Sequence, residues 1–410
     1  MVKSNILLPI FDSIAFIKSQ EAPSEHYLSL AFSAEDFKHA KAFLLSYNGN
    51  HATFNAYRRE VERLLHWSWL IAKKSIKDLL RSDIEAYLQF CQDPPIDWIA
   101  EKKASRFIEE NGTRRPDPQW RPFVATVSKS QFRQGQQPDR TKYSISQKTL
   151  REIITVSGSF YNFLIQEEYT DVNPVLHLRQ KSKYFTKVQG GKVKIRRLSE
   201  LQWIYVIETA ELMAKETPKQ HEKTLFIMTA LYAMYLRISE LAASSRWIPK
   251  MCDFHCDHDG LWWFTTIGKG NKERQISVSD HMLKALRRYR QSMNLSPLPS
   301  ISDQTPLIPK IRGKGPITSI THLRRIVQHC FDETIKRLKQ DGFNEDADAL
   351  LEATVHWLRH AGISDDVKHR PREHVRDDAG HSSSAITDKY IDVELRARHA
   401  SAKHKPIKSD

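Results

Sequence analysis

The sequence is poor in cysteine and has no long apolar run, and each absence narrows the class of protein. Its 410 residues include only 4 cysteines, too few and too scattered for a disulfide framework. The mildly apolar run from Ile6 to Ile17 is interrupted by Asp12, and no small-residue cleavage site follows it. No other stretch is long and apolar enough to span a membrane. We therefore expect a chain that works in a reducing cytosol without a membrane partner.

Acidic residues are also in short supply. The chain has 49 Asp and Glu against 63 Lys and Arg, which gives a formal net charge of +14 and a pI near 9.4. Positive charge can serve solubility alone, but here it clusters in a linker and a tail, as a polyanionic partner such as nucleic acid requires. Hydrophobic residues at 40% exclude a largely disordered chain, and the length predicts two domains with sizeable cores.

The first half has the pattern of a helical bundle. Residues 1–33 show no periodicity, and we expect an irregular N-terminus there. Apolar residues then recur at spacings of three and four in four segments, which predicts helices. The segments are residues 33–44, 51–74, 77–92 and 146–168. We expect a compact bundle of four or five helices over residues 34–178, with Arg58 and Arg59 of the second helix in contact with DNA phosphate.

Two basic segments interrupt this pattern. Residues 94–144 are polar and contain prolines, which predicts a long insertion or loop that is either solvated or in contact with DNA. Residues 179–197 hold eight Lys or Arg and no acid around the pair Gly190-Gly191. This composition predicts an interdomain linker, either a solvated spacer or a connector that lies along a phosphate backbone. Its candidate DNA contacts are Lys181, Lys183, Lys192, Lys194, Arg196 and Arg197.

The second domain, residues 198–410 with a basic C-terminal tail, is predicted to be α+β with a small antiparallel sheet, in a mainly α protein. Helices are predicted at residues 199–216, 223–235, 279–293 and 319–339, and strands at residues 247–254, 261–267 and 273–278. Cys252, His255, Cys256 and His258 are possible zinc ligands. An extended chain spreads them over many ångströms and no second cysteine pair follows, so we expect no metal.

Four short strings in this domain carry residues suited to one chemistry. They are LRISEL, GKGNKER, HWLRHA and GHSSSAITDKY. In chain order they contain Arg237 and Glu240, Lys269, His356 and Arg359, and His381 and Tyr390. Taken alone, the first pair could be an ordinary surface ion pair, because residues three apart on a helical turn lie side by side.

A tyrosine that attacks a DNA phosphodiester needs fixed positive charge beside it. The phenol has a pKa of about 10 and the phosphate is already anionic. Arginine supplies the charge best, because its planar fork matches two non-bridging oxygens. Histidine can donate to the same oxygens or move a proton, and a lysine among other cations can protonate the leaving 5′ oxygen. This chemistry needs no metal or other cofactor.

Together, in this order and at these separations, the four strings resemble the catalytic domain of tyrosine recombinases, the lambda-integrase family. The resemblance covers about residues 198–393, and the first half resembles the family's core-binding domain only in outline. It implies a site-specific recombinase, an integrase that recombines specific sites in double-stranded DNA. It further implies a tetramer on DNA, accessory proteins in some systems and a bacterial cytoplasmic, nucleoid-associated location. The atypical insertion at 94–144 favours an integrase of a mobile element over an enzyme that resolves chromosome dimers.

The resemblance also implies a role for each residue of the strings. Arg237 and Arg359 would hold the scissile phosphate, and Lys269 would be the general acid. Tyr390 would form a 3′-phosphotyrosyl link, which conserves the bond energy and makes the step reversible without ATP. Glu240 would orient Arg237.

His356 and His381 would assist through hydrogen bonds and proton transfer. The sequence departs from the family pattern at two neighbouring positions. Tyr235 stands where glycine is common before Leu-Arg, and Ala379 replaces a common leucine before Gly-His. Neither departure removes a charged or nucleophilic group, so we expect effects on local packing.

Other interpretations stay open at this point. Tyr390 is the only tyrosine after Arg359, and it is either the nucleophile or a buried structural residue. His360, His369 and His374 are interpreted as surface or core residues. A type IB topoisomerase, which relaxes supercoils by related chemistry, and a non-catalytic DNA-binding protein are the alternative functions.

Overall fold

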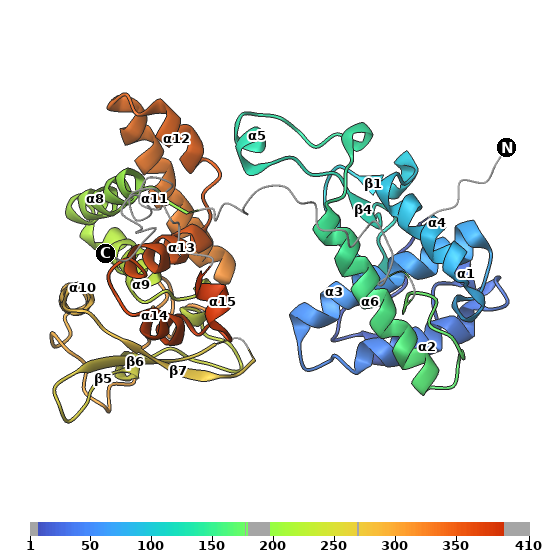
Figure 1. Cartoon of the computed structure of the whole chain (residues 1–410), viewed down its shortest axis with the longest axis horizontal. Helices are drawn as coiled ribbons and strands as arrows, with labels where there is room; N and C mark the ends of the chain where they lie inside the picture. The colour runs from blue at the N-terminus through green and yellow to red at the C-terminus, as the bar shows by residue number, and fades with distance from the viewer. Residues whose placement is uncertain (1–6, 177, 179–196, 269, 389–410) are drawn as a thin grey trace, which may run out of the picture. The chain divides into compact units, whose positions relative to one another are not determined.

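The chain was analysed as a computed structural model, which describes residues 7–176, 178, 197–268 and 270–388 (Figure 1). It divides into two compact units, residues 1–190 and 191–410. The division falls inside the segment predicted as a linker, where Lys181, Lys183, Lys192, Lys194 and Arg196 lie outside the described residues. None of the described helices is long and apolar enough to cross a membrane.

Five of the described helices form the body of the first unit. These are α1 (Glu25–Leu28), α2 (Ser33–Leu45), α3 (His51–Trp67), α4 (Arg81–Gln92) and α6 (Gln147–Gln166). The central helix α3 begins at Asn50, whose side chain accepts hydrogen bonds from the backbone N–H groups of Ala52 and Thr53 at 3.1 and 3.2 Å. It continues into a π-helical turn, Ser68–Ala72, and ends at Lys73 with φ 56°.

The N-terminal segment is irregular, as predicted, but it is part of the core. Leu7, Ile10 and Phe11 are buried. The buried carboxylate of Glu62 on α3 accepts hydrogen bonds from the backbone N–H groups of Ile10 and Phe11 at 2.5 and 3.2 Å. A side chain from α3 thus replaces the backbone partners of a regular element, which is why the segment has no periodicity in sequence.

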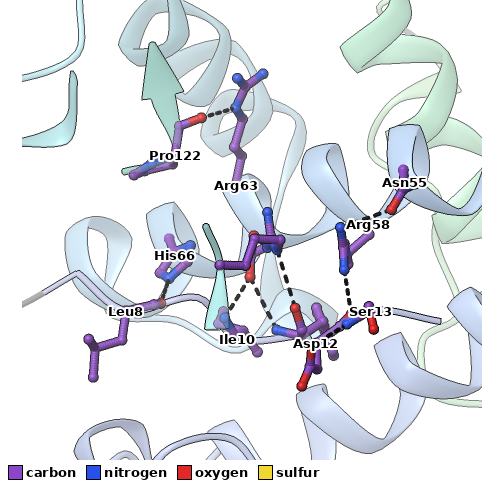
Figure 2. A network of polar contacts seen from close by, with 12 residues as sticks. Leu8, Ile10, Asp12, Ser13, Asn55, Arg58, Arg63, His66 and Pro122 are labelled. Carbon is purple, nitrogen blue, oxygen red and sulfur yellow. Dashed lines mark hydrogen bonds and ion pairs between the residues drawn. The ribbon is translucent and has the colours of Figure 1, made fainter. Parts of the chain in front are cut away.

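The structure argues against the predicted contact of Arg58 with DNA. Its side chain is only 8% exposed, and it donates hydrogen bonds to the Asp12 carbonyl and, at 2.9 Å, to Asn55 Oδ1 (Figure 2). Burial lowers its pKa to about 10 despite the attraction of Asp12. The guanidinium holds the N-terminal segment on α3 and is not available to DNA. Arg59 is half-exposed and pairs with Glu60, so its contact with DNA stays a prediction.

The segment predicted as a loop at 94–144 has structure of its own. It contains β1 (Ile99–Ala100), β2 (Phe107–Glu110), β3 (Thr113–Pro116), β4 (Phe123–Val124) and α5 (Lys129–Arg133). Strands β1 and β4 pair in parallel, while β2 and β3 form a hairpin through Asn111-Gly112, both with positive φ. Trp98, Trp120 and Phe123 are buried and anchor the segment to the unit.

The second unit is a helical body with one small sheet. Its helices are α8 (Glu200–Glu216), α9 (Pro218–Ala233), α10 (Asp280–Ser292), α11 (Ile320–Gln340), α12 (Asn344–Leu350), α13 (Val355–Asp366), α14 (Arg372–Ala379) and α15 (Ser384–Thr387). Its strands are β5 (Phe254–Cys256), β6 (Trp262–Ile267) and β7 (Glu273–Ser277), antiparallel in the order β5-β6-β7. The sheet lies at one end of the unit, where α14 contacts β7 (Figure 1).

The predicted fold class, mainly helical with a small antiparallel sheet in the second half, is confirmed. Helix α8 lies within the predicted range 199–216, and its cap Ser199 accepts a hydrogen bond from the N–H of Gln202 at 3.1 Å. The strand predicted at 247–254 is wrong for most of its length. Met251–Asp253 is a 3-10 turn in which Asp253 accepts from the N–H of Lys250 at 2.6 Å, and only Phe254 of that prediction is in a strand.

Candidate active site

A cleft of about 900 Å³ in the second unit brings together four of the six predicted catalytic residues. Arg237, His356, Arg359 and His381 all line it, although they come from segments up to 144 residues apart in sequence. Gly268 and Gly270 line it as well. Lys269 and Tyr390 lie outside the described residues.

Arg237 is held at the cleft by Glu240, as the sequence predicts. The Arg237 backbone N–H donates to Glu240 Oε2 at 2.8 Å, and its Nη1 donates to Glu240 Oε1 at 3.0 Å. Glu240 is 2% exposed, whereas the Arg237 side chain is 27% exposed. A buried carboxylate therefore fixes the position of an arginine that lines the cleft.

Arg274 on β7 is a supporting residue that sequence reasoning missed. Its Nη1 and Nη2 each donate to a Glu240 oxygen at 2.9 Å, and its Nε donates to the carbonyl of Asp378 at 3.1 Å. Glu240 thus carries two arginines. A Cβ added at Gly268 would lie 3.1 Å from Arg274 Nη1 and 3.5 Å from Arg237 Nη1, so a side chain there would press on the Arg274 guanidinium.

Arg359 on α13 is almost fully buried at 5% exposure. Its Nη1 donates to the carbonyl of Tyr235, and its Nη2 donates to the carbonyl of Ala379 at 2.6 Å. Helix α13 reaches this position because Gly362 packs directly on the end of α9. A Cβ at Gly362 would lie 2.1 Å from the carbonyl oxygen of Tyr232.

The two predicted histidines are neutral bases in this setting. Desolvation and the positive charges of Arg359 and Arg237 lower the pKa of His381 to about 4. The pKa of His356 is lowered by desolvation and by the positive charges of Arg359, Arg324 and Arg237. His381 also hydrogen-bonds through Nδ1 to the Thr387 hydroxyl at 2.9 Å. At neutral pH each imidazole can accept a proton or donate its N–H.

His360 also lines the cleft, which corrects its interpretation as an ordinary surface or core residue. It lies one helical turn after His356, and burial together with nearby His356 and Arg359 lowers its pKa to about 4. The spacing of four residues on one helix was the available signal, because it places both rings on one face. Among the described residues, no group of three or more His, Cys, Asp or Glu side chains is placed to hold a metal ion.

Two solved structures share the fold over nearly the whole chain. One is the XerH site-specific recombinase bound to palindromic difH substrate in a post-cleavage complex, with a TM-score of 0.54, 12% identity, and coverage of 95% of this chain and 93% of that one. The other is XerH in its pre-cleavage complex with difH, with a TM-score of 0.51, 12% identity, and coverage of 97% and 99%. The fold of this chain is therefore similar to that of XerH.

The second unit also matches by sequence. Residues 202–396 match the phage integrase family. Tyrosine recombinase XerD of Rickettsia prowazekii (strain Madrid E) is 29% identical over 143 residues, 34% of this chain and 41% of the relative. XerD of Oceanobacillus iheyensis is 25% identical over 218 residues, 53% and 61% of the two chains. The chain spans about half the length of the curated relatives it matches. Residues 202–396 therefore form a phage integrase domain, similar to that of tyrosine recombinases.

Proposed function

We propose that this protein is a site-specific recombinase that cleaves and rejoins duplex DNA, with Tyr390 as its nucleophile. The observation that carries the proposal is the cleft, in which Arg237 and Arg359 meet His356 and His381. Two fixed guanidinium groups suit a phosphodiester, because they stabilise the negative charge that builds up on its non-bridging oxygens as the nucleophile attacks.

In the proposed cleavage step, the phenol oxygen of Tyr390 attacks phosphorus and the bond from phosphorus to the 5′ oxygen breaks. The phenol proton passes to a neutral imidazole, His356 or His381, and Lys269 protonates the departing 5′ oxygen. The product is a 3′-phosphotyrosyl ester and a free 5′ hydroxyl. One phosphodiester replaces another of similar energy, so attack by the 5′ hydroxyl of a second DNA reverses the step without ATP.

The number of strands that must be cut determines how many chains are needed. Each chain supplies one Tyr390 and therefore cuts one strand, whereas exchange between two duplexes requires four strands to be cut. We propose a tetramer on paired sites, which acts in the bacterial cytoplasm on nucleoid DNA to integrate or excise a mobile element, with accessory proteins where the site requires them. Arg59 and Arg197, together with the basic residues of the linker, are the proposed contacts to the phosphate backbone.

The experiment that tests the proposal is capture of cleaved DNA on Tyr390. A pool of random duplexes, each with one nick, is incubated with the wild-type chain and with Tyr390→Phe, and complexes that resist denaturation are isolated and sequenced. The nick releases a short fragment after cleavage, which prevents religation. We expect a covalent adduct with a shared sequence from the wild type and none from the variant. A wild type that forms no adduct, or a variant that forms as much, overturns the proposal.

A further inference from the structure

Tyr235 combines an unfavourable backbone conformation with nearly complete burial. Its φ is 50°, a left-handed value that crowds the Cβ of any residue other than glycine, and its side chain is 1% exposed. The ring packs in a small apolar cluster with Ile363, Val375 and Ala379, apart from the main core of the unit. An outlier of this kind persists only where the surrounding contacts hold it in place.

The first of these contacts is the backbone carbonyl of Tyr235, which accepts a hydrogen bond from Arg359 Nη1. The left-handed turn follows the end of α9, and the carbonyl meets the guanidinium of α13 there. The other terminal nitrogen of Arg359 donates to the carbonyl of Ala379. The carbonyls of Tyr235 and Ala379, on two different segments, therefore set the orientation of the Arg359 guanidinium. That orientation depends on the distance between the two carbonyls.

The second set of contacts is made by the Tyr235 hydroxyl. These contacts again link the segment that contains Tyr235 to the segment that contains Ala379. The hydroxyl donates to Asp366 Oδ2 and accepts from Arg370 Nη1 at 3.0 Å. Arg370 Nη2 in turn donates to Asp378 Oδ2 at 2.6 Å. Asp378 directly precedes Ala379, so the chain of contacts runs from the Tyr235 side chain back to the second carbonyl that holds the arginine.

We infer that Tyr235 is a positioning residue for Arg359. Its carbonyl accepts a hydrogen bond from Nη1 of the guanidinium. Its hydroxyl, through Arg370 and Asp378, fixes the segment of Ala379, whose carbonyl accepts from Nη2. Tyr235 does not line the cleft and acts only through Arg359 and its partners. The role of Arg359 in binding the scissile phosphate rests on the function proposed above.

A neighbouring tyrosine provides a matched control. Tyr232, one helical turn earlier, donates its hydroxyl to Asp365 Oδ2 at 2.8 Å and so also links α9 to α13 through an aspartate. Its carbonyl packs on Gly362, away from the guanidinium. Tyr235→Phe and Tyr232→Phe each remove one hydroxyl from a tyrosine–aspartate bond, and both keep the ring. Asp366 and Arg370 also pair directly at 3.2 Å, a contact that does not involve the Tyr235 hydroxyl and should protect the fold of the first variant.

The test compares single-turnover cleavage of captured nicked DNA by the two variants at saturating DNA. We expect Tyr235→Phe to slow cleavage by about tenfold or more, because small displacements of a positioned group are costly, with DNA affinity and melting temperature changed no more than in Tyr232→Phe. In an Arg359→Lys background the same change should slow cleavage by less than about twofold, because the group it positions is gone. Equal rates for the two variants, or an undiminished effect in the Arg359→Lys background, overturn the inference.

A readout without cleavage separates this inference from the proposed function. Inorganic phosphate is titrated into the full chain, and its binding is followed through the NMR signals of the cleft histidines. We expect weaker phosphate binding in Tyr235→Phe than in the wild type and Tyr232→Phe. Failure of the wild type to form an adduct contradicts the proposed function alone. Unchanged phosphate binding in Tyr235→Phe contradicts the positioning role.

Discussion

At the scale of single residues, the cleft depends on side chains that hold its arginines in place. Glu240 is buried and binds two arginines that both line the cleft, Arg237 and Arg274, and Arg274 also donates to the carbonyl of Asp378 near the end of α14. A buried carboxylate with two cationic partners is a fixed point, because displacing either partner leaves charge unpaired inside the protein. Arg237 is therefore oriented by a buried partner, Glu240.

Arg274 gives the sharpest prediction at this scale. Arg274→Gln removes both hydrogen bonds to Glu240 and should lower the single-turnover cleavage rate by about a hundredfold, because Arg237 loses its rigid support. Arg274→Lys should restore little of the rate, since one ammonium does not reproduce two parallel hydrogen bonds. The measurement is the rate of adduct formation on the captured DNA, with far-UV circular dichroism to verify folding.

Arg288→Gln is the control for this change. Arg288 forms a comparable fork with Glu222 on the surface, with distances of 2.7 to 3.1 Å, but it lies outside the cleft. Because the Arg288 side chain is 44% exposed, the loss of that pair should cost at most about 1 kcal/mol of stability and leave the rate unchanged. Similar rates in Arg274→Gln and Arg288→Gln would show that Glu240 does not need its second arginine.

At the scale of elements, the first unit is held by buried polar contacts around α3. His66 is fully buried, and its Nε2 lies 2.9 Å from the Leu8 carbonyl and 3.1 Å from the Tyr27 hydroxyl. Burial lowers its pKa to about 4. The neutral ring joins the N-terminal segment and α1 to the middle of the bundle.

This contact predicts a pH dependence of stability. The unfolded chain protonates His66 below its ordinary pKa of 6.5, whereas the folded chain does not until about pH 4. Between these values the unfolded state binds more protons, so stability falls as pH falls from about 6.5 to about 4, by up to about 3 kcal/mol. Hydrogen-exchange protection of the α3 amides measures it. His66→Gln should flatten the profile, and an unchanged slope in that variant would contradict the assignment.

The elements that the sequence predicts well are those with local signals. Helix α8 begins at its Ser199 cap, and the strands β6 and β7 lie within one residue of their predicted bounds, because periodicity and turns are local. The hairpin β2–β3 was predictable from Asn111-Gly112, a strong turn signal. Leu80 fits the apolar stripe of α4 but precedes the helix and is 64% exposed.

What the sequence could not predict depends on long-range contacts. Arg58 lies near the boundary between the apolar and polar faces of its helix, but the Asp12 carbonyl, 46 residues away, accepts its hydrogen bond inside the unit. Arg274 is unremarkable in a strand until its guanidinium meets Glu240, 34 residues away. Four motifs were sufficient to group the cleft residues because each motif carries its own chemistry. Arg274 is the last residue of GKGNKER, but nothing in that string shows that it pairs with Glu240.

At the scale of the whole molecule, the two units divide the work proposed for the chain. The second unit contains the cleft and the phage integrase domain, and the first unit and the basic linker carry the remaining proposed DNA contacts. A formal net charge of +14 suits binding to a long phosphate backbone, and it predicts an affinity for DNA that falls steeply with salt concentration.

The assembly is tested on the same scale. Gel filtration of the full chain with duplexes that carry the captured site should give complexes of four chains with two duplexes. The chain and the duplex are mixed in that same proportion, so that neither is in excess. Tyr390→Phe serves as the control, because it should assemble in the same way without cutting. Complexes that contain only one chain at every protein concentration would contradict the tetramer.

The central claim is that Tyr390 carries the cleaved strand by its 3′ phosphate. The most direct measurement is mass spectrometry of the peptides from the captured adduct after digestion with nuclease and protease. We predict that the mass of a nucleotide is added to the peptide containing Tyr390, while the released DNA fragment carries a free 5′ hydroxyl. A nucleotide on any other residue, or a released fragment with a 5′ phosphate, would contradict the account.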